Sequence, residues 1–235
     1  MRKFYLFGMI LVLILARHSV AHAQWVEASG QGGNSVNAFA VSGTNICAGT
    51  NDGVILSTDN GTSWTAVNSG LTNTDVHALA VSGTDLFAGT YGGGVFLSTN
   101  NGTSWTAVNS GLTNTYVYSL AVSACGRGTN VFAGTSGGGA FLSTNNGTSW
   151  TAVDSGLTNP YLVSAFAVSP ASCGSGTNLF AGTGGGGVFL STNNGTSWTA
   201  VNSGLTATIV LSLAVSGTNL FAGTKGGVWR VRLSQ

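Results

Sequence analysis

A five-residue string, Ser-Trp-Thr-Ala-Val, occurs four times along this chain at nearly regular intervals. Its tryptophans lie at positions 64, 105, 150 and 198, so successive copies are 41, 45 and 48 residues apart. A second string, Ala-Gly-Thr preceded by Phe or Cys, occurs five times with a similar spacing. Internal periods of about 20–50 residues are typical of solenoids and propellers, in which copies of one structural unit stack on each other. The chain is therefore predicted to be a repeat protein.

One repeat contains four short strand-like runs, which in the second copy are residues 76–81, 85–90, 94–98 and 104–108. Ser-Gly-Thr, Gly-Gly-Gly and Asn-Asn-Gly turns separate these runs. After residue 23, no stretch has helical periodicity with capping residues. Four strands in each 40–48 residues are typical of a propeller blade. We therefore expect an all-β fold, a β-propeller of four-stranded antiparallel blades.

The count of strands predicts how the ring closes. Five first, second and third strands can be recognised, but only four complete fourth strands follow them. Residues 25–30 align with residues 64–70 and are one residue shorter. This N-terminal strand is expected to complete the C-terminal blade, which ends in residues 227–231. Such pairing closes a five-bladed ring and removes two exposed sheet edges.

The N-terminal segment, residues 1–23, has the pattern of a signal peptide. Arg2 and Lys3 precede an uncharged stretch over residues 4–16, and Ala21 and Ala23 occupy the positions that a signal peptidase inspects. The apolar stretch is shorter than the roughly 20 residues that a membrane-spanning helix needs. We expect cleavage before Gln24, which leaves residues 24–235 as a single propeller domain without a membrane span. The mature protein is expected to be secreted, or periplasmic or extracellular.

The composition excludes several classes of partner. Charged residues make up 6% of the chain, whereas ordinary domains carry about 25%. Without residues 1–23, four cationic and six acidic side chains remain, which gives a net charge of −2 and no basic patch for nucleic acid. His77 is then the only histidine, which excludes a metal site built from several histidines. No phosphate-binding glycine loop precedes a helix. No cofactor and no metal are expected.

Residues 57–64, Ser-Thr-Asp-Asn-Gly-Thr-Ser-Trp, match the Asp-box pattern S-x-D-x-G-x-x-W at every position. The chain therefore resembles the BNR/Asp-box repeat propellers, a group that includes sialidases, sortilin ectodomains, xyloglucanases and photosystem assembly factors. Three further copies carry Asn100, Asn145 and Asn193 in place of the aspartate. We call the four copies, residues 57–64, 98–105, 143–150 and 191–198, the box segments. The resemblance implies that they are folding devices on the outer hairpin, remote from any catalytic centre.

Local chemistry leads to the same interpretation. Asn-Gly favours a tight turn in which both residues have positive φ, and the preceding Asx side chain can accept hydrogen bonds from nearby backbone N–H groups. The tryptophan is expected to cover the apolar side of its own hairpin. The residues expected to have these structural roles are Ser57, Asp59, Gly61, Trp64, Gly102, Trp105, Gly147, Trp150, Gly195 and Trp198.

The resemblance also suggests enzymes, and the residues argue against them. A sialidase-like site requires three clustered arginines with a tyrosine nucleophile, and no such cluster is apparent. A xyloglucanase-like inverting site requires two carboxylates roughly 6.5–9.5 Å apart across a cleft. Only Glu27, Asp52 and Asp75 are free for this role, and the pattern singles out no pair. A glycoside hydrolase therefore remains an alternative, as does an assembly factor for an envelope complex.

The three cysteines have two different settings. Cys47 replaces the phenylalanine of the Ala-Gly-Thr string, so we expect a small buried apolar side chain. Cys125 and Cys173 each lie seven residues before that phenylalanine, in equivalent extended loops of adjacent repeats. In an exported protein these two cysteines can form a disulfide, and two free thiols are the alternative.

Residues that differ between repeats are the candidates for binding. All four tyrosines after residue 23 are of this kind, and they fall in connections that open on one face of a propeller. Tyrosine offers a flat ring for stacking and a hydroxyl for hydrogen bonding, so a few of them suit a sugar or a peptide. The candidate residues on this face are Tyr91, Tyr116, Tyr118, Tyr161, Asp75, His77 and Lys225. The alternative is that these residues only pack on blade edges. We expect a non-catalytic module that binds an extracellular glycan or a partner protein.

Overall fold

The computed structural model describes residues 35–123, 129–159, 161–169 and 178–233. All its regular elements are strands, and they form five antiparallel sheets. Blade 1 consists of β1 (Val36–Ser42), β2 (Asn45–Thr50), β3 (Gly53–Ser57) and β4 (Thr65–Ala66). Blade 2 consists of β5 (Val76–Ser82), β6 (Asp85–Thr90), β7 (Gly94–Ser98) and β8 (Thr106–Ala107). Blade 3 consists of β9 (Val117–Ser123), β10 (Asn130–Thr135), β11 (Ala140–Ser143) and β12 (Thr151–Ala152).

The last two blades continue the same order. Blade 4 consists of β13 (Val163–Val168), β14 (Leu179–Thr183), β15 (Gly187–Ser191) and β16 (Thr199–Ala200). Blade 5 consists of β17 (Val210–Ser216), β18 (Asn219–Thr224) and β19 (Gly227–Arg232). The segment predicted to supply the fourth strand of blade 5, residues 25–30, lies outside the described residues. The predicted fold is confirmed: the chain is a five-bladed β-propeller.

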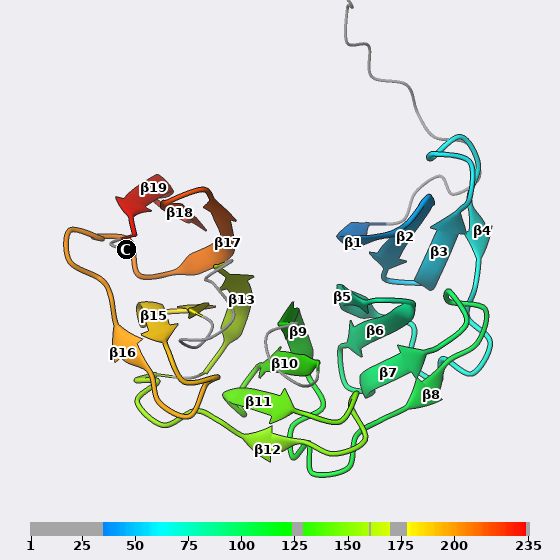
Figure 1. Cartoon of the computed structure of the whole chain (residues 1–235), viewed down its shortest axis with the longest axis horizontal. Helices are drawn as coiled ribbons and strands as arrows, with labels where there is room; N and C mark the ends of the chain where they lie inside the picture. Colours follow the sequence, from blue (N-terminus) through cyan, green and yellow to red (C-terminus); the bar gives the residue numbers. More distant parts are fainter. Residues whose placement is uncertain (1–34, 124–128, 160, 170–177, 234–235) are drawn as a thin grey trace, which may run out of the picture.

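The five blades follow one another around an arc, with β1, β5, β9, β13 and β17 on its inner side (Figure 1). Each inner strand packs against the inner strand of the next blade, from β1 through to β17. In Figure 1 the arc is open between blade 5 and blade 1, and among the described strands no broad packing joins these two blades.

The apolar core lies between the blades. One cluster joins Cys47 and Val54 of blade 1 to Leu86 and Phe96 of blade 2, and three equivalent clusters join the following pairs of blades. Cys47 is 1% exposed, as predicted, and burial raises the pKa of its thiol to about 11, so it is protonated at neutral pH. Each blade is therefore stabilised by its neighbours rather than by a core of its own.

The Ala-Gly-Thr string has a structural role in each repeat. Gly49 of β2 lies so close to Val76 of blade 2 that a Cβ atom on it would be 2.6 Å from Val76 Cγ1. The hydroxyl of the next residue, Thr50, donates a hydrogen bond of 3.0 Å to the carbonyl of Gly53 and so closes the β2–β3 turn. Glycine at this position lets adjacent blades approach closely, and threonine satisfies a buried carbonyl.

The predicted turn of the box segments is confirmed. Asn60 and Gly61 have φ values of 58° and 85°, and the other three segments repeat this pair of positive values. Asp59 Oδ1 accepts a hydrogen bond of 2.9 Å from the backbone N–H of Ser63. Hydrogen bonds from Ser63 and Ser57 lower the pKa of the Asp59 carboxyl from 3.8 to about 2. The preceding Asx residue therefore locks the turn, as expected from the sequence.

The prediction for the box tryptophans was wrong in one respect. Trp105 is 4% exposed and packs in the cluster between blades 1 and 2, and its Nε1 donates a hydrogen bond of 2.7 Å to the carbonyl of Val67 in blade 1. Trp150 and Trp198 make the same bond to Val108 and Val153 of their preceding blades. In these three segments the indole therefore fastens its blade to the one before it, because the deep apolar space lies between the blades. Trp64 behaves as predicted, since its Nε1 donates a hydrogen bond of 3.2 Å to the carbonyl of Gly61 in its own turn.

Candidate functional site

Four aromatic rings gather at one end of blades 2 and 3. His77 and Tyr118 occupy the same position in inner strands β5 and β9, and their ring centroids are 4.8 Å apart. Tyr91 follows β6 and stacks on His77 at 5.6 Å. Tyr116 precedes β9 and meets the Tyr91 ring edge-on at 4.8 Å. We call these four residues, together with Asp75, the aromatic cluster.

The backbone holds the cluster across the boundary between two blades. The N–H of Tyr91 donates to the carbonyl of Asp75 at 2.8 Å, and an isolated β-bridge pairs Tyr91 with Tyr116 of the next blade. The side chain of Asn73 accepts from the N–H of Asp75 and donates to the carbonyl of Tyr91. Both loops are therefore fixed by hydrogen bonds, so the rings are presented on a preformed surface.

The cluster is partly exposed and carries a polar edge. Tyr91 and Tyr116 are each 44% exposed, which leaves part of each ring open to solvent. Asp75 Oδ1 lies 3.2 Å from His77 Nε2. Burial, and to a smaller extent the proximity of Tyr91 and Asp75, raises the pKa of the Tyr118 hydroxyl, so this group stays a neutral donor at physiological pH. The surface offers flat rings, phenolic hydroxyls and one carboxylate.

Two of the candidate residues lie outside the cluster. Tyr161 is 79% exposed in the connection that leads to β13, and Lys225 follows β18. In the described part of the chain, no ring contact, ion pair or hydrogen bond joins either residue to the aromatic cluster. Tyr161 belongs to blade 4 and Lys225 to blade 5, so they occupy other sectors of the same arc (Figure 1).

Other groups considered from the sequence are distributed around the molecule. Asp52 lies in the β2–β3 turn, where its backbone N–H is bound by Thr50 Oγ1, and Asp75 belongs to the aromatic cluster. Glu27, Cys125 and Cys173 lie outside the described residues. In the described ranges, no group of three or more His, Cys, Asp or Glu side chains is arranged to hold a metal ion. The same ranges contain no helix long and apolar enough to cross a membrane.

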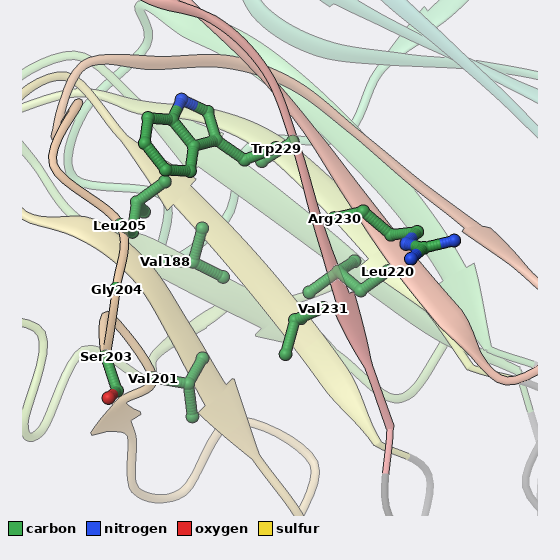
Figure 2. Close-up of a pocket in the computed structure, with 10 residues that line it drawn as sticks. Val188, Val201, Ser203, Gly204, Leu205, Leu220, Trp229, Arg230 and Val231 are labelled. Carbon is green, nitrogen blue, oxygen red and sulfur yellow. The ribbon is translucent and has the colours of Figure 1, made fainter.

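The structure also shows a pocket that was not predicted from the sequence. It has a volume of about 280 Å³ and lies between blades 4 and 5 (Figure 2). Its walls are largely apolar, and they include Val188 and Leu205 from blade 4 and Leu220 and Trp229 from blade 5. The one signal in the sequence is Trp229, which replaces a residue that is phenylalanine in three of the other repeats. The volume is just below the roughly 300–1,000 Å³ typical of small-molecule sites.

Comparisons with known proteins identify the architecture. No protein-family model and no curated protein matches the chain. An extracellular domain of a Bacteroides thetaiotaomicron protein described as a hybrid two component system superposes with a TM-score of 0.67 at 17% identity, over 90% of this chain and 29% of that one. The Niastella koreensis GH74 enzyme gives a TM-score of 0.61 at 23% identity, over 89% and 32% of the two chains.

An ancestral GH74 enzyme gives a TM-score of 0.64 at 21% identity, over 83% of this chain and 30% of that one. The present chain therefore spans about a third of the length of each of these structures. At these identities the likeness concerns the fold, and it places the chain among the β-propellers.

Proposed function

We propose that this protein is an exported, non-catalytic binding module that holds a saccharide on the aromatic cluster. The observation that carries the proposal is the contact set of Tyr91, Tyr116, Tyr118 and His77, whose ring centroids lie 4.8–5.9 Å from one another where they touch. Sugar rings have apolar faces edged with hydroxyls. Exposed tyrosine rings complement the faces, and phenolic hydroxyls and a carboxylate complement the edges.

The character of the repeats supports a role in binding. The residues shared by the repeats build the turns and the interfaces between blades, whereas the cluster residues differ from repeat to repeat and their side chains contact one another. An Asp-box propeller leaves its loops free for such a site, since its box segments lie on the outer hairpins. The GH74 and extracellular sensor structures that share this fold are compatible with a saccharide ligand outside the cell. The proposed signal peptide, residues 1–23, is compatible with the same location.

The proposal is tested by a glycan array followed by calorimetric titration of the best oligosaccharide. Tyr91→Ala and Tyr116→Ala are expected to weaken binding at least tenfold each, because each removes one stacking face worth about 0.5–1.5 kcal/mol together with its hydrogen bonds. The matched control is Tyr161→Ala, which removes a more exposed tyrosine outside the cluster and is expected to leave the affinity unchanged.

Thermal unfolding separates a binding role from a packing role. If the cluster is a binding surface, the two cluster variants keep a melting temperature close to that of the wild type. A lowered melting temperature with unchanged binding would contradict the proposal, and so would the absence of any oligosaccharide ligand. Hydrolysis of a bound oligosaccharide would instead favour a glycoside hydrolase, and binding only to a protein partner would favour the assembly-factor alternative.

A further inference from the structure

Three equivalent slots between blades are each filled by a box tryptophan. In the first, Trp105 of blade 2 packs with Val54, Val67 and Leu71 of blade 1 and with Leu86 and Phe96 of its own blade. Its backbone N–H donates to the carbonyl of Ser69 at 2.8 Å, in addition to the indole bond to Val67. Trp150 and Trp198 occupy the next two slots with equivalent backbone bonds, to Ser110 and Ser155.

The pocket between blades 4 and 5 is the fourth slot of this series. The repeat places Val188, Val201 and Leu205 where the first slot has Val54, Val67 and Leu71. It likewise places Leu220 and Trp229 where the first slot has Leu86 and Phe96. All five residues line the pocket, and Figure 2 shows the Val188, Val201 and Leu205 side chains on the blade 4 side and Trp229 on β19.

The residues that contact a tryptophan in the other three slots have no such contact in this pocket. Gly70 and Gly111 are in close contact with the backbone of the slot tryptophan, whereas no described heavy atom lies within 4 Å of the position where a Cβ would stand on Gly204. Leu205 is half-buried, whereas Leu71, Leu112 and Leu157 are 6–7% exposed. The indole Nε1 of Trp229 is buried and has no hydrogen-bond partner among the described residues. The slot therefore has the apolar walls of the other three, and the place that a tryptophan backbone takes against Gly70 and Gly111 is open at Gly204.

We propose that this pocket is the receptor for Trp25, so that residues 24–30 dock on β19 as the fourth strand of blade 5 of the same chain. Five of the six tryptophans are accounted for by the box segments and Trp229, so Trp25 is the one left for the slot. The number of residues between Trp25 and the next strand is also suitable. Trp25 precedes Val36 of β1 by 11 residues, and Trp64, Trp105 and Trp198 each precede the first valine of the next blade by 12.

The pairing seen in complete blades fixes the register of the docked strand. Phe96 of β7 pairs with Ala107 of β8, two residues after Trp105. The same register pairs Trp229 with Glu27, the only carboxylate in residues 24–30. A carboxylate is a strong acceptor, and docking in this register would put it opposite Trp229, whose buried indole N–H has no partner among the described residues. Docking thereby pairs the exposed edge of β19 and fills the apolar pocket.

The test is thermal unfolding of the full chain with Trp25→Ala. We expect the melting temperature to fall by roughly 10 °C, because an aromatic side chain is removed from an interface between blades. Trp150→Ala is the matched reference, since Trp150 fills an equivalent slot, and it is expected to lower the melting temperature by a similar amount. Val26→Ala is the neutral control, because the equivalent residues Thr65 and Thr106 are exposed.

A melting temperature of Trp25→Ala equal to that of the wild type, with Trp150→Ala destabilised, would overturn the proposal. Hydrogen exchange of the wild type gives a second measurement that needs no variant. Amides of β19 are expected to exchange as slowly as those of β15, which has strands on both sides. Faster exchange, typical of an open edge, would overturn the proposal, and so would a wild-type protein that is only dimeric, since the segment would then come from a second copy.

Discussion

At the scale of single residues, the four box segments show how one turn is built with two different side chains. Asp59 Oδ2 accepts a hydrogen bond of 2.6 Å from the hydroxyl of Ser63. In the second copy, Asn100 Nδ2 instead donates a bond of 2.8 Å to the hydroxyl of Ser104. The serine hydroxyl can rotate to donate or accept, so both versions leave the turn satisfied.

Asp59→Asn is therefore expected to leave the urea midpoint almost unchanged at pH 7. In acid, the stabilities of the wild type and the variant should differ. The folded-state pKa of Asp59 is about 2, below its ordinary value of 3.8, so the ionised carboxylate stabilises the native state above about pH 4, and this contribution is lost as the pH falls through 2. Urea unfolding at pH 7, 4 and 2 measures the difference. Equal loss of stability by both proteins between pH 4 and 2 would contradict this account.

At the scale of strands and blades, close packing of a glycine against a valine joins consecutive blades. A Cβ atom on Gly89 of β6 would stand 2.6 Å from Val117 Cγ1 of β9, and the same pair recurs at Gly49 with Val76 and at Gly182 with Val210. Each valine of these pairs is fully buried. The second strand of one blade can therefore approach the inner strand of the next only because the glycine has no side chain.

Gly89→Ala is expected to destabilise the fold by about 1–3 kcal/mol, because the added methyl group overpacks the interface. Val117→Ala removes the atoms that this methyl group meets, so the double variant should lose less stability than the sum of the two single variants. A double-mutant cycle from urea unfolding measures this coupling. Strict additivity would show that the contact does not limit the approach of the blades.

The repeat pattern predicted the strands well and the contacts between blades poorly. Strands β5, β6 and β7 begin and end within one residue of the runs expected from alternation and turn residues. The fourth strand is shorter than expected because the side chain of Asn109 takes over part of the ladder and accepts from the N–H of Val95 at 2.7 Å. Three of the four box tryptophans were assigned to the wrong surface because an exact repeat looks the same whether a residue packs within its own unit or on the neighbouring one.

The residues of the candidate site could be predicted because they depart from the repeat. Tyr91, Tyr116, Tyr118 and His77 depart from the repeat, and all four fall in adjacent blades at the same end of the strands, so they come together. Tyr161 departs from the repeat as well, but it belongs to blade 4, and no other ring in the described part of the chain contacts it. Departure from the repeat therefore identified the candidates, and only the arrangement in space showed which of them form one surface.

At the scale of the whole molecule, the two ends of the arc carry matching halves of one interface. Val36 begins β1 and is 45% exposed, whereas the equivalent valines of the other four blades are fully buried. Gly223 in β18 occupies the position of Gly49 and Gly89, but among the described residues no side chain from another blade lies against it. Val228 is 80% exposed, and its equivalents Val54 and Val95 are buried. These residues are expected to meet when blade 5 packs on blade 1 and closes the ring.

Closure of the ring can be measured in the methyl-labelled wild-type protein by nuclear Overhauser effects between protons of Val36 and Gly223. The contact between Val76 and Gly49 serves as the internal reference, because it joins the same two repeat positions across blades 1 and 2. A closed five-bladed ring predicts an effect between the Val36 methyl groups and the Gly223 α-protons that is comparable to the reference. A clear reference effect with none between Val36 and Gly223 would contradict the closed ring.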